Sequence, residues 1–139
     1  MDDVSKLTKL GSQGTDYKFT TPSVGMLETF PNQNAHRNYG VSHECTEFSS
    51  LCPMTGQPDF AEIHIRFVPD ELCVETKSLK LYLFAFRSHG AFMETLTNKI
   101  HDDLVAAMAP RSISVSSMFR SRGGIQTSVM VESHKETTK

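Results

Sequence analysis

The chain has 139 residues, a length typical of one domain with its own hydrophobic core. Its 14 Lys and Arg residues stand against 16 Asp and Glu residues, so the formal net charge is −2 and no basic excess favours a nucleic acid or an anionic membrane as partner. Three cysteines without a CxxC spacing argue against a disulfide framework. Without a membrane-spanning apolar segment or a secretory leader, the sequence predicts a cytoplasmic protein.

Three segments of the chain differ in their local patterns. Residues 1–40 are rich in glycine, proline and asparagine and show little periodicity, which predicts a loop-rich N-terminal arm. Residues 41–133 carry the apolar patterns expected of a single catalytic domain. Residues 134–139 are polar and predict an exposed tail.

The first predicted strands lie in the middle of the chain. Apolar and polar residues alternate over residues 61–67, which predicts a half-buried strand. Pro69, Asp70 and Glu71 are typical of a turn, and a second strand is predicted over residues 72–75. Because the connection is short, we expect these two strands to pair as a hairpin.

Two predicted helices follow. Residues 78–86 are dense in apolar side chains, and Ser78 as an N-cap favours a helix there. Over residues 91–108, apolar side chains recur every four residues, which predicts an amphipathic helix that ends before Pro110. The recurring residues are Phe92, Leu96, Ile100, Leu104 and Met108.

Two further strands are predicted over residues 113–119 and 125–131, joined by a glycine-rich turn at residues 120–124. The order strand, strand, helix, helix, strand, strand predicts an α+β domain. In it, helices lie on one face of an antiparallel four-stranded sheet. The open edges of such a sheet favour a homo-oligomer.

A thiol and a carboxyl group stand out as candidate catalytic groups. Cys52 lies beside a proline, and Asp59 follows seven residues later in the same turn-rich segment. A thiolate is a strong nucleophile and a carboxyl group can donate or accept a proton, so the pair suggests covalent catalysis. A buried cysteine and a turn-capping aspartate would have the same residue types, and on the residues alone this interpretation stays open.

Several charged residues are candidates for ligand binding. Lys77 and Lys80 stand at the start of a predicted helix, where backbone N–H groups can hold a phosphate, although a solvated charged edge is the alternative. Arg122, in an Arg-Gly-Gly turn, can present its guanidinium to an anion. Glu94 can accept hydrogen bonds from a purine-like ring, or simply stabilise a helix N-terminus. The histidines show no metal-ligand spacing, so we expect no metal site.

Four segments together resemble the QueF family, the NADPH-dependent nitrile reductases of queuosine biosynthesis. The nucleophile motif is FSSLCPMTGQPDFA at residues 48–61, and the motif that names the family is ETKSLKLY at residues 75–82. FRSHGAFME at residues 86–94 and SRGGIQT at residues 121–127 follow in order. Several motifs in the right order are far more specific than any one of them.

The resemblance implies the tunnelling fold, a ring-forming architecture. The short chain resembles the branch in which two pentameric rings stack face to face, with active sites between subunits. NADPH is the implied cofactor. The implied substrate is 7-cyano-7-deazaguanine, which is reduced to 7-aminomethyl-7-deazaguanine in a tRNA-modification pathway.

The implied residue roles follow the matched motifs. Cys52 would form a covalent thioimide with the nitrile, and Asp59 would act as the general acid. Lys77, Lys80 and Arg122 would bind the phosphates of NADPH. Substrate contacts are implied for Val74, Glu75, Thr76, Met93 and Glu94.

One departure from the family pattern concerns substrate binding, and two other functions stay open. Where the family usually has His-Glu, this chain has Met93-Glu94, and a thioether cannot donate a hydrogen bond. An amidinotransferase of archaeosine synthesis would form the same thioimide and add ammonia to it instead of a hydride. A protein of this fold could also bind a purine or pterin without catalysis.

Overall fold

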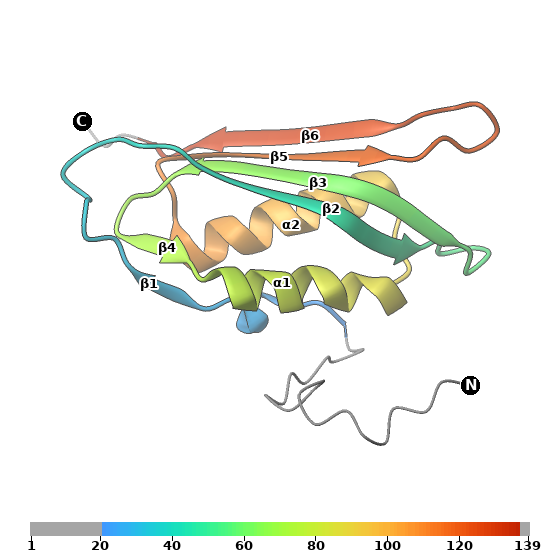
Figure 1. Cartoon of the computed structure of the whole chain (residues 1–139), viewed down its shortest axis with the longest axis horizontal. Coiled ribbons are helices and arrows are strands. Elements are labelled where there is room, and N and C mark those ends of the chain that lie inside the picture. The colour runs from blue at the N-terminus through green and yellow to red at the C-terminus, as the bar shows by residue number, and fades with distance from the viewer. Residues whose placement is uncertain (1–20, 137–139) are drawn as a thin grey trace, which may run out of the picture.

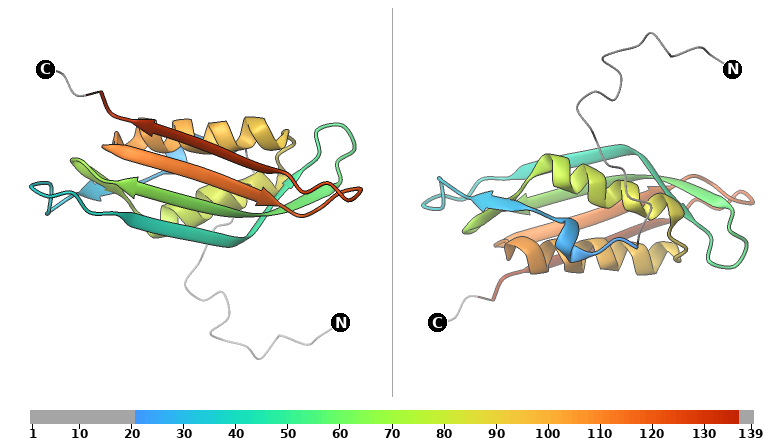
Figure 2. Two further views of the ribbon diagram at one scale, coloured as in Figure 1. Left: turned by 90° about the horizontal axis from the view of Figure 1, so that it is seen from above. Right: turned by 90° about the horizontal axis from the view of Figure 1, so that it is seen from below.

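The computed structural model describes residues 21–136, which form two layers. The upper layer in Figure 1 is a four-stranded sheet, and two helices lie beneath it. The views from above and below in Figure 2 place both helices on the same face of the sheet. The predicted α+β class with an antiparallel sheet is therefore confirmed.

The strands of the main sheet follow the order β2-β3-β5-β6, and each neighbouring pair is antiparallel. The strands predicted over residues 61–67 and 113–119 are confirmed. The last strand begins three residues later than predicted, because Arg122 and Ile125 exchange backbone hydrogen bonds of 2.9 Å in a longer turn. The four strands are β2 (Val41–Leu51), β3 (Pro58–Val68), β5 (Ser112–Phe119) and β6 (Ser128–His134).

The predicted hairpin between residues 61–67 and β4 (Leu72–Val74) is wrong. β4 instead pairs antiparallel with β1 (Thr29–Pro31) in a separate two-stranded sheet, and β1 follows the short 3-10 helix η1 (Val24–Met26) in the chain. The hairpin partner of β3 is β2, which the sequence pattern did not identify. A register shift between Cys45 and Phe48 breaks the alternation of β2, and its first half carries mostly polar side chains.

Helix α1 (Thr76–Ala85) begins two residues earlier than predicted. Its N-cap is Glu75, whose carboxylate accepts hydrogen bonds from the backbone N–H groups of Lys77 and Ser78 at 2.7 and 2.8 Å. The predicted cap, Ser78, lies buried in the first turn, where its hydroxyl accepts a hydrogen bond from Glu28 N at 2.9 Å. The longer glutamate side chain thus takes the capping role that short polar residues usually fill.

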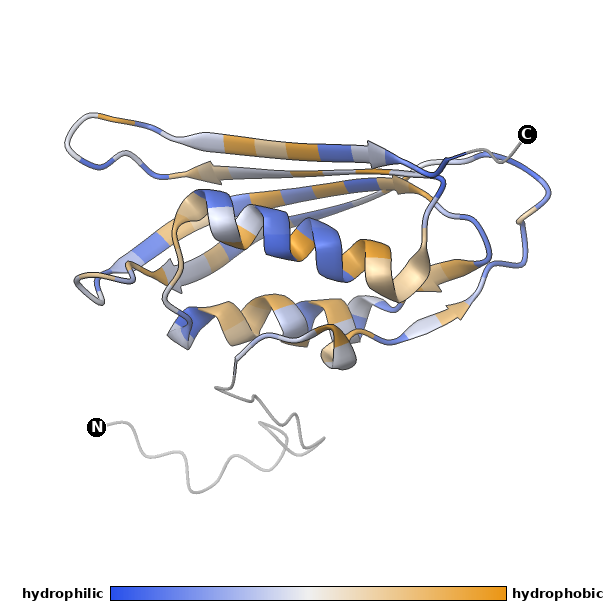
Figure 3. Ribbon diagram, turned by 180° about the vertical axis from the view of Figure 1, so that it is seen from behind, coloured by the Kyte–Doolittle hydropathy of each residue, from blue (hydrophilic) through white to orange (hydrophobic). Residues whose placement is uncertain are grey.

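Helix α2 (Met93–Met108) confirms the second predicted helix. Its C-cap is Ala109, whose φ of 44° is left-handed, just before Pro110. Phe92 is an exception to the predicted apolar face, because it is the N-cap and is 57% exposed. Figure 3 shows polar residues along the outer side of α2. The core between α2 and the sheet includes Leu96, Ile100, Leu104, Met108, Ile63, Ile65, Val115 and Phe119.

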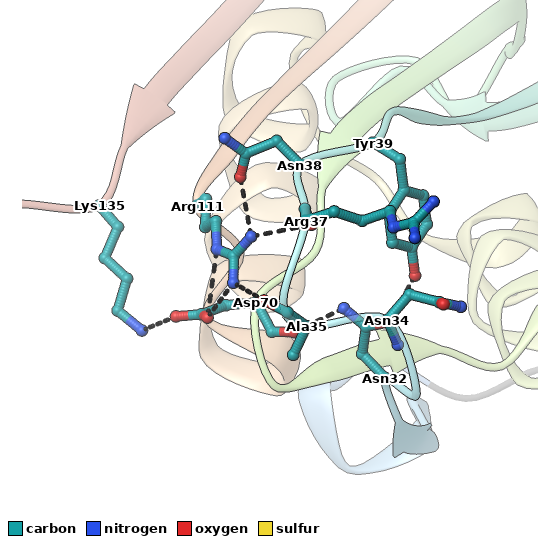
Figure 4. Close-up of polar contacts among 9 residues, drawn as sticks. All are labelled: Asn32, Asn34, Ala35, Arg37, Asn38, Tyr39, Asp70, Arg111 and Lys135. Atoms are coloured by element: carbon teal, nitrogen blue, oxygen red, sulfur yellow. Dashed lines mark hydrogen bonds and ion pairs between the residues drawn. The ribbon is translucent and has the colours of Figure 1, made fainter.

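A polar network around Arg111, called here the Arg111 clamp, ties the connection between β1 and β2 to the rest of the fold (Figure 4). The guanidinium donates hydrogen bonds to main-chain and side-chain oxygens of that connection and to a carboxylate in the turn after β3. Its partners are the carbonyl oxygens of Ala35 and Arg37, the side-chain oxygen of Asn38 and the carboxylate of Asp70.

Replacement of Arg111 by Met is expected to lower the thermal unfolding midpoint by several degrees, because several acceptors lose their donor at once. Lys135→Met is the control, since the Lys135 side chain is 48% exposed and makes one 2.7 Å hydrogen bond, to Asp70. That bond holds the pKa of the Asp70 carboxyl below its usual value. Its contribution is therefore full above the unfolded pKa of about 3.9 and is lost as the pH falls through the lower folded value. Equal shifts of the thermal unfolding midpoint in the two variants at pH 7 would contradict the stabilising role given to the Arg111 clamp.

Candidate active site

Cys52 lies where β2 ends, in a tight turn that leads into β3. Backbone hydrogen bonds close the turn, from Cys52 N to Gln57 O at 2.8 Å and from Gly56 N to Cys52 O at 2.9 Å. Gly56 has a φ of +71°, a conformation that glycine adopts without strain. Hydrogen bonds from the hydroxyl and N–H of Thr55 and from the N–H of Met54 lower the pKa of the Cys52 thiol. A thiolate stabilised in this way is a competent nucleophile.

Asp59 is the second residue of β3 and is 7% exposed. Its Oδ1 pairs with Nε of Arg122 at 2.6 Å, and Nη2 of Arg122 also donates to the carbonyl oxygen of Pro58 at 3.0 Å. The negative charge of Asp59 opposes the lowering of the Cys52 pKa, so the two groups are close enough to interact. The structure therefore brings together the candidate nucleophile, the candidate acid and Arg122, one of the three residues predicted to bind the cofactor.

The end of β2 also contacts the segment that precedes α2. Leu51 N donates to His89 O, and Ala91 N donates to Leu51 O, both at 3.1 Å. Gly90 lies between them against Pro53, where a Cβ would come within 3.3 Å of the Pro53 Cα. The glycine thus permits a close backbone approach, which sets the start of α2 beside the Cys52 turn.

Met93 and Glu94 form the first turn of α2, next to this contact. Glu94 is exposed, and it lines a shallow surface groove with Asn98 and Lys99. Met93 is half-buried against the hydrophobic core, and its carbonyl oxygen accepts a hydrogen bond from the Thr97 hydroxyl at 2.7 Å. The Glu94 side chain is therefore reachable by a ligand, whereas Met93 also contributes to packing.

The other predicted ligand-binding residues lie where β4 meets α1. Val74 is buried, and hydrogen bonds from the backbone N–H groups of Lys77 and Ser78 lower the pKa of the capping Glu75 carboxyl. The expectation that these N–H groups are open to a phosphate is wrong, because the carboxylate occupies them. The side chains of Lys77 and Lys80 remain exposed on the first turns of α1.

Within one chain the predicted site residues fall into two groups, one beyond the C-terminal end of α1 and the other along β4 and the first half of α1 (Figure 1). The first, called the nucleophile cluster, consists of Cys52, Asp59, Met93, Glu94 and Arg122. The second, called the α1 cluster, consists of Val74, Glu75, Thr76, Lys77 and Lys80. The ten residues of α1 span about 15 Å between the two ends. Two members of the α1 cluster, Thr76 and Lys80, line a groove of about 480 Å³ between α1 and β2.

Sequence reasoning missed two contacts in the nucleophile cluster. The hydroxyl of Thr55 is three residues from Cys52 in a turn segment, a spacing that could have identified it as a partner of the thiol. The ion pair of Arg122 with Asp59 joins residues far apart in the sequence, and no local signal reveals it.

The described part of the chain holds neither a cluster of metal ligands nor a membrane-spanning helix. Over residues 21–136, no three His, Cys, Asp or Glu side chains gather in a way that could hold a metal ion. None of the described helices is both long and apolar enough to cross a membrane.

Known proteins are similar to this chain in sequence and in fold. The family model described as QueF-like protein matches residues 58–138. The NADPH-dependent 7-cyano-7-deazaguanine reductase of Bacillus pumilus is 50% identical over 139 residues, covering 99% of this chain and 83% of the relative. The protein of that name from Nitratidesulfovibrio vulgaris strain DP4 is 49% identical over 135 residues, covering 97% and 81%.

A solved structure of an archaeosine synthase QueF-Like, in the apo form, aligns with a TM-score of 0.64 at 19% sequence identity. The alignment covers 70% of this chain and 96% of that chain, and it shows a shared fold. The family match over most of the folded chain agrees with the relatives that share half of its residues. This chain therefore belongs to the QueF-like protein family.

Proposed function

We propose that this protein is an NADPH-dependent nitrile reductase that converts 7-cyano-7-deazaguanine to 7-aminomethyl-7-deazaguanine in queuosine biosynthesis. The relatives named for this reductase support the assignment, since they match nearly the whole chain. The observation that carries it is the Cys52 thiol of lowered pKa, held beside Asp59 and the start of α2. Three unpaired cysteines also fit a reducing compartment such as the cytoplasm.

Covalent catalysis by Cys52 explains why the site needs an activated thiol. The sulfur attacks the nitrile carbon, so that an S–C bond forms as one C–N π bond breaks. The proton lost from the thiol ends on the nitrogen, with Asp59 as the relay. The resulting thioimide accepts a hydride more readily than the nitrile does.

When bound, NADPH supplies the hydrides for two successive reductions. Between them the S–C bond breaks and the thiol of Cys52 is restored. Lys77 and Lys80 fit a role in phosphate binding because their side chains are exposed on adjacent turns of α1. Arg122 already forms an ion pair with Asp59, so binding of an NADPH phosphate by Arg122 would compete with that ion pair.

We further propose that the substrate lies between two chains, with Glu94 of the nucleophile cluster binding its ring and Val74, Glu75 and Thr76 supplying further contacts. The separation of the two clusters within one chain supports this arrangement. It accords with the tunnelling fold and with a decamer of two stacked pentameric rings. The strands β2 and β6 lie at the edges of the sheet and are available to neighbouring subunits.

Mass spectrometry of the intact protein tests the proposed function. Mixing with 7-cyano-7-deazaguanine alone should raise the protein mass by the mass of the substrate, and later addition of NADPH should release the amine with two NADPH oxidised per nitrile. An adduct that turns over with ammonia and leaves NADPH unchanged would instead identify an amidinotransferase. Tight binding without any adduct would identify a purine-binding protein.

Met93 offers a further test of the substrate site. A histidine there could hydrogen-bond the bound base, and such a bond is typically worth on the order of 0.5–1.5 kcal/mol. Met93→His is therefore expected to tighten substrate binding or raise turnover by roughly tenfold. Met93→Leu is the control, because it keeps the apolar contact with the core and should change activity little. Steady-state NADPH oxidation compares them, and a histidine variant no better than the wild type would show that the pocket does not need this bond.

A further inference from the structure

The hydroxyl of Ser50 is buried without a hydrogen-bond partner. Ser50 is the penultimate residue of β2, it is 0% exposed, and within the described residues its Oγ is the buried side-chain atom that lacks a partner. Ser117 offers a contrast, since it is equally buried and its hydroxyl bonds to Thr97 at 2.6 Å. Buried hydroxyls are normally paired, because an unpaired one destabilises the folded protein. The buried Ser50 hydroxyl therefore does not stabilise the folded protein, which suggests that it has another role.

Ser50 lies directly across the sheet from Asp59. The two residues are register partners in the β2–β3 pair, and both side chains are buried on the inner face. Side chains at such positions have Cβ atoms about 4.5–5.5 Å apart. Oδ1 of Asp59 is held by Arg122 from the β5–β6 connection, whereas Ser50 approaches from the neighbouring strand, two residues before Cys52.

We propose that Ser50 is a positioning residue for the proton relay of Asp59. Asp59 is a carboxylate in the free protein, where Arg122 holds it, and it becomes one again once the proton taken from the thiol has passed to the nitrogen. During that second transfer the Ser50 hydroxyl turns toward Asp59 and donates a hydrogen bond, which stabilises the charge as it returns to the carboxylate. No atom is transferred to or from Ser50. This role rests on the proposed function, because it requires adduct formation at Cys52.

Ser50→Ala separates a catalytic contribution from a structural one. Removal of an unpaired hydroxyl should leave the thermal midpoint unchanged or raise it, whereas adduct formation with 7-cyano-7-deazaguanine should slow by about tenfold, the effect typical of a hydrogen bond to a charged group. The KM for NADPH should not change. Rapid quench and mass spectrometry measure the rate of adduct formation, and calorimetry measures the thermal unfolding midpoint.

Two other serines provide matched controls. Ser49→Ala alters the neighbouring residue, which is half-buried, and should affect neither quantity. Ser117→Ala should lower the midpoint, because that hydroxyl is paired. An unchanged adduct rate in Ser50→Ala would overturn the proposal, and so would a midpoint that falls as much as in Ser117→Ala. A wild-type protein that forms no adduct would overturn the proposed function first, and this assignment with it.

Discussion

Replacement of Cys52 by Ala is expected to abolish both the substrate adduct and NADPH oxidation while the fold is retained. Its thiol is held in a turn where hydrogen bonds from Thr55 and Met54 lower its pKa. Loss of a covalent nucleophile typically reduces turnover by orders of magnitude. Intact mass after mixing with the nitrile, followed by NADPH absorbance, measures the two losses separately.

The other two cysteines serve as controls for this result. Burial raises the pKa of the Cys45 thiol, and Cys73 is buried 3.8 Å from the hydroxyl of Tyr39. Both thiols are poorer nucleophiles for these reasons. Cys45→Ala and Cys73→Ala should therefore still form the adduct, and iodoacetamide should alkylate Cys52 first in the wild type. Adduct formation by Cys52→Ala, or its loss in a folded Cys45→Ala or Cys73→Ala variant, would show that the nucleophile is wrongly assigned.

A mixture of two defective variants is expected to regain activity if each site takes its two clusters from different chains. Cys52→Ala lacks the nucleophile, and a Lys77→Ala/Lys80→Ala double variant lacks the exposed lysines of the α1 cluster. Co-refolding them in equal amounts should restore roughly a quarter of the wild-type rate at low NADPH, since random assembly combines two intact halves in that share of sites.

The control replaces the double variant with a triple variant that also carries Cys52→Ala. This mixture contains no intact nucleophile, so it should stay inactive whatever the arrangement of the subunits. Activity in the first mixture alone would support sites shared between chains. If the first mixture also stays inactive although the subunits have exchanged, then both clusters must act within one chain, and the proposed arrangement is wrong.

Local patterns were sufficient where one face of an element is buried along its whole length. The four-residue spacing of Leu96, Ile100 and Leu104 predicted α2, because these residues form one buried stripe on a helix. The alternation over residues 61–67 predicted β3 for the same reason, with a period of two. The candidate nucleophile and the candidate acid could also be named from the sequence, since Cys52 and Asp59 belong to one short segment.

Contacts between residues far apart in the chain could not be predicted from local patterns. β2 was missed because its bulge interrupts the alternation, and β4 was paired wrongly because its partner, β1, lies about forty residues earlier in the chain. The cap of α1 was also misassigned, since either Glu75 or Ser78 could have accepted its N–H groups. Strand pairing and capping depend on which groups meet in space, and a local sequence pattern does not contain that information.

The sequence by itself therefore determined the family and the helices and strands that bury a continuous face, and it named a candidate nucleophile with a candidate carboxyl partner. Only the tertiary structure decided how these parts meet. It paired Arg122 with Asp59, placed the unpaired hydroxyl of Ser50 across from the same carboxylate, and left the α1 cluster at the far end of its helix. Residue types carry chemical capability, whereas the hydrogen bonds and ion pairs that direct it form only when distant segments pack together.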